Sequence, residues 1–467
     1  MLILMGSPAL RSASIQVAVS VLANWGMLNT GMSMAFPSAV VPPLLGSAPG
    51  LHASVDEASW IASMSMMTAT FACPVSGQLI DRIGRRKGLI LLSLLAAIGW
   101  LLMAVISQTL YALYAGRLFT GFATGMASSI SAVYTSEVTV VSLRTTLVSF
   151  SPIMLAAGVY LVYIWILFYQ NSWVEVSYFA FGLSMISLVL TPLLPESPMW
   201  LLSGGRAEEA LQALQRLRGA SAPEQVKEEL DSFSGRASDR QQTTSWLSAF
   251  HKLQRPQSYK PLLIMLTYFL FQQMSGVTLV LVYAVDFARD AGIMAEAYYI
   301  ALAMSSARML GTFLAIWICS LWGRRLPAVL SGTIMSVSMS GLALSVSPFL
   351  SLPLWLVSAL SVTFVTSSAI GFAALPLSMT GEVFPTDVRG VCSGLTSCLG
   401  FFATFVVVKI YPGTVRAVGA FPVFVFFAAS GIMGTIFLYV FLPETHGKTL
   451  LQIENYFKGT SKQKTHI

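Results

Sequence analysis

Charged residues are scarce in this sequence. Lys, Arg, Asp and Glu together make up 10% of the 467 residues, whereas a soluble globular domain carries about 25%. Hydrophobic residues make up 55%, and the mean hydropathy is +0.73. So few polar side chains cannot cover the surface of a soluble globule of this size. The composition therefore excludes that class and favours a protein embedded in a membrane.

Motifs of several other classes are absent. The four cysteines, Cys73, Cys319, Cys392 and Cys398, show neither metal-site spacing nor an obvious disulfide pairing, so we expect packing residues. No Gly-rich phosphate-binding loop is present, which argues against ATP-driven transport by this chain. No catalytic constellation occurs either. We therefore predict neither an enzyme nor a cofactor or metal, and nucleic acid is not an expected partner.

The sequence does contain a series of apolar stretches near twenty residues long, each sufficient for a helix that crosses a bilayer. We interpret them as twelve transmembrane helices, and the predicted fold class is an all-α membrane protein. The predicted spans are residues 15–36, 58–79, 88–107, 110–136, 146–168, 174–194, 261–285, 297–319, 326–347, 352–381, 391–411 and 418–442.

Lys and Arg are concentrated in alternate loops of this predicted bundle. They gather in 81–87, 206–260, 324–325 and 448–464, whereas the loops near 37–57, 107–109, 169–173 and 346–353 contain none. Basic loops of membrane proteins stay in the cytoplasm. We therefore predict that both termini are cytoplasmic, and we expect a multi-pass protein of the plasma membrane.

Three motifs occur twice, in the same order and roughly half the chain apart. GRR at 84–86 recurs at 323–325, SEVTVVSLR recurs as GEVFPTDVR, and LPESP recurs as LPETHG. Repeats of this kind predict two six-helix halves. The predicted domains are an N-terminal half at 1–202, a cytoplasmic helical linker at 203–258, a C-terminal half at 259–446 and a cytoplasmic tail at 447–467.

The repeated motifs place acids and arginines at the cytoplasmic ends of helices. The two halves of an alternating-access transporter must be held together there while the substrate site faces outward. Arg can bind a carboxylate through two hydrogen bonds, and such pairs near water are weak enough to break. An alternative is that these charges only anchor loops and fix the topology. The predicted gating salt bridges involve Asp81, Arg85, Arg86, Glu137, Arg144, Glu196, Arg324, Arg325, Glu382, Arg389 and Glu444.

These motifs resemble those of the major facilitator superfamily and, within it, the sugar porter family. GQLIDRIGRRKG, GRLFTG, YTSEV, PESPMWLL, FQQMSG, GEVFPTDVRG and PETHGKT follow in family order across almost the whole chain. DEASWIASM, FPTDVRG and Pro152 are most similar to arthropod facilitated trehalose transporters. The resemblance implies the major facilitator fold, with a small cytoplasmic helical segment between the halves.

The resemblance also places the substrate near FQQMSGVTLVLVY in the seventh span. Gln272 and Gln273 offer the donors and acceptors that sugar hydroxyls need. Gly276 allows local unwinding, as discontinuous transporter helices require. Tyr283 is placed to close over a sugar, and Thr278 stands where the family usually has Asn. We name Gln272, Gln273, Thr278 and Tyr283 as candidate substrate contacts, although the glutamines could instead bind neighbouring helices.

Several positions depart from the family pattern. Pro152 replaces the usual Gln of the fifth span, and Leu377 replaces the usual Trp of the tenth. Ser320 and Leu321 replace the acidic and first basic residues of the second loop motif. These departures weaken the expected contacts with a sugar, which puts ordinary glucose selectivity in doubt.

Arg308 is the least expected residue, because it lies in the middle of the eighth span, where the family usually carries an amide. A charge at this depth is expected to face the bundle interior and to have a partner. We consider an ion pair with Asp286, a direct contact with the substrate, and a side chain that extends toward the membrane surface. Arg308 therefore joins the list of candidate substrate contacts.

The predicted function is passive uniport of a small-molecule sugar, trehalose or a hexose such as glucose, by a monomer in the lipid bilayer. Proton-coupled members of the family typically place an Asp in the first span, whereas QVAVSVLANWGMLNTGMSMAF holds no acid. The alternative is a non-transporting sugar sensor, or a carrier of another polyol or organic solute. A sensor is expected to carry a long signalling tail, and only residues 443–467 follow the last span, which favours the carrier.

Overall fold

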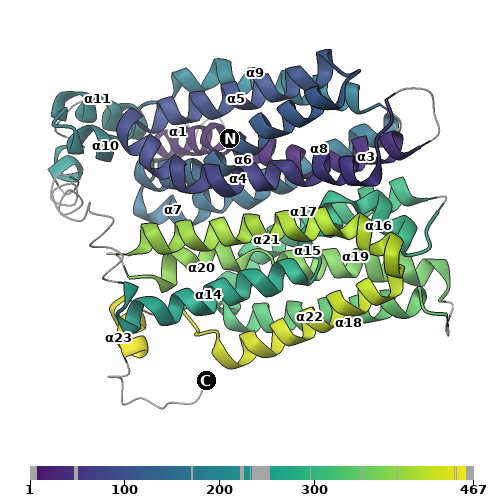
Figure 1. Cartoon of the computed structure of the whole chain (residues 1–467). Helices are drawn as coiled ribbons and strands as arrows, with labels where there is room; N and C mark the ends of the chain where they lie inside the picture. The colour runs from purple at the N-terminus through teal and green to yellow at the C-terminus, as the bar shows by residue number, and fades with distance from the viewer. Residues whose placement is uncertain are drawn as a thin grey trace.

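The computed structural model describes residues 8–46, 51–169, 172–220, 253–294, 296–348, 352–385, 388–445 and 450–458, with 224, 226–231, 233, 350 and 448 between them. Within these residues, all regular elements are helical. The helices form two bundles that lie side by side with their helices roughly parallel (Figure 1). The all-α prediction is thereby confirmed.

The first bundle contains six membrane-crossing units. The first unit is divided into three pieces, and the fifth is divided into two. In chain order the helices are α1 (Pro8–Ala23), α2 (Trp25–Ala35), α3 (Pro37–Leu45), α4 (Val55–Ile83), α5 (Arg85–Val105), α6 (Leu110–Val138), α7 (Val141–Val148), α8 (Phe150–Phe168) and α9 (Trp173–Leu190), which continues as a 3₁₀ turn at Thr191–Leu193.

The second bundle has a similar plan, except that its fourth unit rather than its fifth is in two pieces. Its first unit is again in three pieces, α14 (Pro256–Met274), α15 (Val277–Val282) and α16 (Ala284–Asp290). The remaining helices are α17 (Ala297–Trp322), α18 (Arg325–Ser345), α19 (Leu354–Ile370), α20 (Leu375–Val383), α21 (Arg389–Val418) and α22 (Ala420–Phe441).

Among the helices whose bounds the structure describes, three short ones lie outside the bundles, all at one end of the molecule (Figure 1). They are α10 (Pro198–Ser203), α11 (Ala207–Arg218) and α23 (Leu450–Lys458). Helix α11 lies within the predicted helical linker, and its Leu214 and Leu217 are buried. Much of the predicted linker 203–258 and of the tail 447–467 lies outside the described residues. We call the end of the molecule that carries α10, α11 and α23 the basic end, and we call the other end the opposite end.

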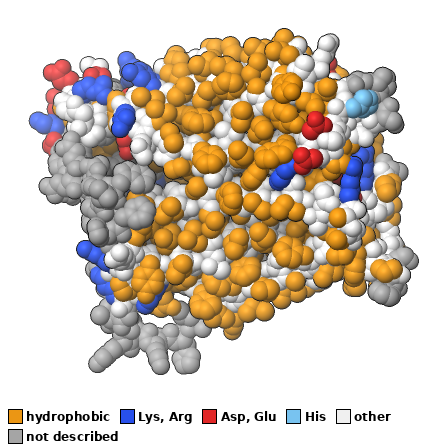
Figure 2. All heavy atoms as spheres, in the orientation of Figure 1, with side chains coloured by type: hydrophobic (Ala, Val, Ile, Leu, Met, Phe, Trp, Pro, Cys, Tyr) orange, Lys and Arg blue, Asp and Glu red, His pale blue; other side chains and the backbone are white. Residues whose placement is uncertain are grey.

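Charged side chains gather at the basic end, whereas hydrophobic atoms cover the middle of the visible face of both bundles (Figure 2). Among the described helical segments, seven are long and apolar enough to cross a membrane: α5, α17, α18, α21, α22, Ser142–Phe168 and Trp173–Leu193. The first unit misses this criterion because it is broken into pieces of 16, 11 and 9 residues. In the seventh unit, α14 has 19 residues but begins with the polar stretch 256–260 and ends with Gln272 and Gln273. Helices α4 and α6 are 29 residues each but rich in Ser, Thr and Gly.

Local sequence explains where two of these helices begin. Ser54 precedes α4 and accepts a hydrogen bond from the Glu57 backbone N–H at 3.3 Å, while the Glu57 carboxylate accepts from the Ser54 N–H at 2.8 Å. This reciprocal pair satisfies N–H groups that have no partner inside the helix. The break at Ser149, between α7 and α8, lies just before Pro152, whose ring excludes the carbonyl of the residue four positions earlier.

The two bundles meet along two helix pairs. Helix α4 of the first bundle packs against α21 of the second, and α8 packs against α17. Smaller contacts join α2 to α15 and α3 to α16. The interrupted units of both bundles therefore lie at the boundary between the halves, where side chains can reach from one half to the other.

Candidate substrate path and gates

Arg85 organises a charged cluster at the basic end of the first bundle. Its side chain is 2% exposed. Its Nε and Nη2 donate to the two carboxylate oxygens of Glu137 at 3.0 and 3.2 Å, and Asp81 lies 2.9 Å from Nη2. Glu137 also accepts a hydrogen bond from the Ser197 hydroxyl at 2.6 Å. The guanidinium thus ties together the ends of α4, α5 and α6.

Glu196 completes this cluster by capping a helix. Its carboxylate accepts the backbone N–H groups of Arg85 and Arg86 at 2.9 and 3.0 Å, at the start of α5. A negative charge is favoured there because the first N–H groups of a helix have no internal partner and carry the positive end of its dipole. Gly84 adopts φ 98°, and a Cβ at this position would lie 2.6 Å from a Glu196 carboxylate oxygen. Only glycine fits this turn.

The second bundle contains the same arrangement. Arg324 donates to Glu382 at 2.7 Å, and Thr445 donates to Glu382 at 2.7 Å. The Glu444 carboxylate accepts the backbone N–H groups of Arg324 and Arg325 at 2.9 and 3.0 Å. The sequence repeat is therefore a structural repeat, in which Arg85, Glu137 and Glu196 correspond to Arg324, Glu382 and Glu444. Asp81 has no acidic counterpart, because Ser320 stands there.

The remaining predicted gating arginines bind backbone carbonyls. Arg144 donates to the Thr139 carbonyl at 3.5 Å, and Arg389 donates to the Phe384 carbonyl at 3.2 and 3.3 Å. Each of the contacts named so far joins elements of a single bundle. In this conformation Arg85 and Arg324 each organise a cluster within one half, and the role of the predicted gating residues between the halves remains a prediction.

At the opposite end, an ion pair does join the halves. Lys409 of α21 donates to the Asp56 carboxylate of α4 at 2.6 Å and to the Ser59 hydroxyl at 2.8 Å. Its ammonium also lies 4.5 Å from the centre of the Trp60 ring. The sequence analysis missed this pair. A signal was present, because Lys409 is the only charged residue in the predicted span 391–411.

A second contact between the halves lies deeper at the opposite end and is fully buried. The Tyr163 hydroxyl of α8 donates to the Leu281 carbonyl of α15 at 2.7 Å. Ser38 of α3 donates to the Val282 carbonyl at 3.0 Å, and the Ser38 and Tyr163 hydroxyls lie 2.9 Å apart. The first-half side chains therefore use backbone carbonyls of the interrupted seventh unit. Together with Lys409, these contacts close the opposite end.

The two glutamines of the seventh unit lie side by side near the end of α14. Gln272 donates to the Ala373 carbonyl at 2.9 Å, in the break between α19 and α20. Gln273 donates to the Gln272 side-chain carbonyl at 3.4 Å. The Gln273 side-chain carbonyl is buried and has no partner among the described residues. One amide therefore supports a neighbouring segment, whereas the carbonyl of the other is left without a partner in the part of the chain that the structure describes.

The rest of the seventh unit follows the predicted break. The chain passes through Gly276 at φ 79° between α14 and α15, which confirms the predicted interruption. Thr278 is half-buried on α15. Tyr283, between α15 and α16, donates to the Val408 carbonyl at 3.4 Å and stacks on Tyr411 with ring centres 5.7 Å apart. Tyr283 thus contacts α21 at the boundary that Lys409 also occupies.

Arg308 does not pair with Asp286. The Arg308 Nε and Nη1 atoms are buried without a hydrogen-bond partner among the described residues. Asp286 instead lies 3.9 Å from Arg289, one turn along its own helix. The expected ion pair is therefore wrong for this conformation, because Asp286 has a nearer cation on α16. The Leu377 side chain lies outside what the structure describes.

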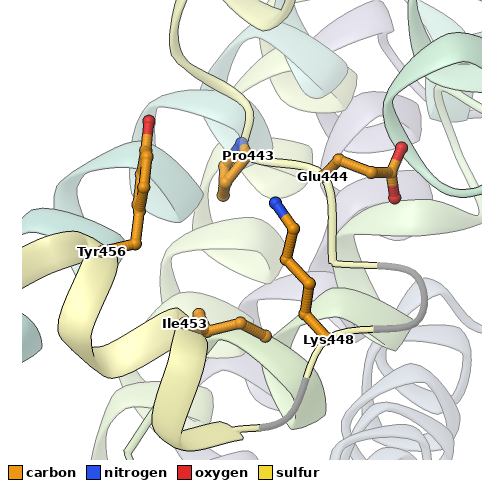
Figure 3. A pocket seen from close by; sticks show the side chains of 5 residues that line it. All are labelled: Pro443, Glu444, Lys448, Ile453 and Tyr456. Carbon is orange, nitrogen blue, oxygen red and sulfur yellow. The ribbon is translucent and has the colours of Figure 1, made fainter. Parts of the chain in front are cut away.

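A small pocket lies at the basic end, where α23 approaches the chain that follows α22 (Figure 3). Pro443, Glu444, Lys448, Ile453 and Tyr456 line it. The Lys448 side chain extends between Tyr456 and Glu444 in this view (Figure 3). Because no predicted substrate contact lines this pocket, it belongs to the docking of the tail helix rather than to the substrate path.

Two interrupted, pseudo-symmetric bundles with polar groups at their boundary define a multi-pass membrane transporter. Known structures support this fold. The proton:xylose symporter XylE bound to 6-bromo-6-deoxy-D-glucose has a TM-score of 0.77 and 21% identity, covering 96% of this chain and all of that chain. The inward-open xylose transporter XylE from E. coli also has a TM-score of 0.77, with 94% and 99% covered. The chain has the major facilitator fold.

The family model described as "Sugar (and other) transporter" matches residues 16–457, and the chain belongs to this family. Facilitated glucose transporter member 8 of solute carrier family 2 from Bos taurus is 30% identical, covering 93% of this chain and 92% of that protein. Facilitated trehalose transporter Tret1 from Apis mellifera ligustica is 27% identical, covering 97% and 90%. The chain is thus a transporter rather than an enzyme.

Proposed function

We propose that this protein is a facilitative carrier that moves a sugar, trehalose or a hexose such as glucose, across a membrane by alternating access. The observation that carries the proposal is the match to sugar transporters along almost the whole chain. The local geometry is in keeping with it, because Gln273 keeps a buried acceptor beside a broken helix. Sugar hydroxyls are suitable donors for such an acceptor.

The proposed substrate contacts are Gln272, Gln273, Thr278, Tyr283 and Arg308. Gln272 and Gln273 would bind hydroxyls after their present contacts rearrange, and Tyr283 would close the path from the opposite end. All of these side chains come from the seventh and eighth units of the second bundle. A sugar held there would lie close to the boundary between the halves, which is where an alternating-access carrier exposes its site to either side.

The charged clusters form the proposed gate at the basic end. Each cluster is complete within its own half here, while the opposite end is closed by Lys409, Ser38 and Tyr163. We infer that when the opposite end opens, the two clusters approach each other and exchange some of these contacts across the boundary. Exchange between comparable ion pairs costs little free energy, so the carrier can change state reversibly.

Transport is proposed to be uniport. Helices α1, α2 and α3 of the first unit contain no acid, so this unit offers no carboxylate to carry a proton with the sugar. The basic end is proposed to face the cytoplasm, with both termini, in the plasma membrane. We further propose a monomer in the lipid bilayer, divided into halves 1–202 and 259–446 with the linker 203–258 and the tail 447–467.

Uptake of a panel of labelled sugars into liposomes that contain the purified protein tests this function. Trehalose and glucose are compared with a polyol and with protein-free liposomes. We expect saturable uptake of trehalose or a hexose that excess unlabelled sugar suppresses. Uptake of no sugar above the protein-free level would contradict the proposed function.

A further inference from the structure

Arg308 lies near the middle of α17 and is half-buried. Its Nε and Nη1 atoms are buried, and neither has a hydrogen-bond partner in the part of the chain that the structure describes. A charge at membrane depth is costly unless a partner compensates it, and such residues mark ligand or ion pathways. The molecule therefore contains a cation for which the described chain supplies no anion.

The side chain belongs to the inner face of its helix. The buried residues Ala301, Met304, Gly311 and Ala315 lie three, four or seven positions from Arg308, so they share its face of α17. Helix α17 packs against α8 of the first bundle and against α19 of the second, and Gly311 lies against Thr366 and Ala369 of α19. Arg308 thus lies on the packed face of a helix that borders both halves.

Neither end of α17 is within reach of the guanidinium. Arg308 is eleven residues from Ala297 and fourteen from Trp322, which corresponds to about 16 Å and about 21 Å along the helix at 1.5 Å per residue. An arginine side chain is much shorter than either distance. The side chain therefore does not reach the membrane surface, which excludes that explanation of its presence.

The neighbouring helices provide no counter-charge. The sequences of α8, α18 and α19 contain neither Asp nor Glu. Helix α16 has two acids, but Asp286 lies 3.9 Å from Arg289, and Asp290 accepts a hydrogen bond from the Tyr411 hydroxyl at 2.6 Å. Among the described residues, no carboxylate therefore pairs with Arg308 in this conformation, and the buried Asp286 Oδ2 is itself without a hydrogen-bond partner there.

We propose that Arg308 binds a monovalent anionic group inside the transport path. The anion is either a carboxylate carried by the sugar, as in a uronic acid, or a free anion such as chloride held beside a neutral sugar. A planar carboxylate matches the forked donors of a guanidinium. This inference rests on the proposed function and narrows its substrate class.

Binding and transport are measured separately on the full-length purified protein. Thermal unfolding in detergent is recorded with sodium glucuronate, with glucose and with sodium chloride, each in a chloride-free buffer of a bulky sulfonate. A ligand that binds only the folded protein raises its melting temperature. Uptake of labelled glucuronate and of labelled glucose into liposomes is measured in buffers that contain the same anions.

Arg308→Gln removes the charge, Arg308→Lys retains it without the fork, and Arg416→Gln removes an exposed charge at the far end of α21 as a matched control. We expect glucuronate or chloride to stabilise the wild-type protein and Arg416→Gln alike. Arg308→Gln should bind that anion roughly tenfold or more weakly, because a charged hydrogen-bond partner is lost. Arg308→Lys should retain part of the binding, and it keeps the test valid if Arg308→Gln fails to fold.

The outcomes distinguish a carboxylate on the sugar from a free anion, and they test the anion site separately from the proposed carrier function. Stabilisation and uptake of glucuronate identify a carboxylate on the sugar, whereas chloride-dependent glucose uptake identifies a free anion. Glucose uptake that neither anion affects would overturn the anion site and leave the proposed function intact. Equal anion binding by Arg308→Gln and the wild type would also overturn it. Anion binding lost in Arg308→Gln, without uptake of any sugar, would support the site and contradict the carrier.

Discussion

Lys409 of α21 and Asp56 of α4 form an ion pair of 2.6 Å that links the second bundle to the first at the opposite end. The Asp56 side chain is 78% exposed, so water screens the pair, and it is expected to contribute only about 0.2–1 kcal/mol. This is enough to bias an equilibrium between two conformations without fixing it. The pair is therefore suited to act as a latch, that is, to stabilise reversibly the form that is closed at the opposite end.

Lys409→Gln should shift the population toward the form that is open at the opposite end, by up to about fivefold, because the latch is lost. Labelling of a cysteine introduced near the Ser38 contact reports this opening. Asp56→Asn should give the same shift, and the double variant should add nothing further. Additive shifts would show that the two residues do not act through their pair.

Glu382→Gln should shift the population the other way. The neutral amide can still accept a hydrogen bond from Arg324 in the present form, but it loses the charge needed for the pair that we propose Glu382 forms with the other half when the basic end closes. Cysteine labelling from the two sides of the membrane can measure the change. An unchanged population would mean that the clusters at the basic end only anchor helices.

Gln273→Ala should weaken sugar binding by roughly 1–3 kcal/mol, the usual cost of losing a polar partner. Surface abundance should stay near the wild-type level, because the Gln273 carbonyl has no partner in the described chain. Gln272→Ala should reduce binding similarly and also lower the melting temperature, since Gln272 supports the Ala373 carbonyl. Wild-type transport kinetics in both variants would place the sugar elsewhere.

Gly84→Ala should reduce the amount of folded protein, because residue 84 has a positive φ that favours glycine and an added Cβ would clash with Glu196. Gly323→Ala should behave likewise, since a Cβ there would lie 2.7 Å from Glu444. Gly182→Ala is a matched control, because nothing lies within 4 Å of its added Cβ. Abundance in a membrane fraction is the measurement. Equal abundance of all three variants would contradict the tight turn.

The sequence predicts the broad plan well, because long apolar stretches and repeated motifs reflect strong constraints. It also locates the break at Gly276, since glycine marks such positions. The break at Phe36 also has a sequence signal, because Pro37 directly follows it and begins α3. The break at Asn24 has neither glycine nor proline at the break itself, so it depends on packing that a linear pattern does not record.

Which charged residues pair with each other was harder to predict from the sequence than which charged residues are functional. The motifs identify Arg85 and Glu137 as functional charges, but only the folded bundle shows that they bind each other within one half. Arg308 illustrates the same limit, because sequence distance favoured Asp286 and the helix faces do not bring the two together. A pair that joins two helices depends on the rotation of each helix about its axis.

The central claim, passive carriage of a sugar, is tested most directly by an imposed proton gradient. Liposomes that contain the protein are loaded at a neutral pH, diluted into acidic buffer with a labelled sugar that the protein accepts, and followed until uptake stops. Because the first unit contains no acid, the internal sugar concentration should rise to the external one and no further, with or without a protonophore. Accumulation above the external concentration that collapses when a protonophore is added would contradict the account.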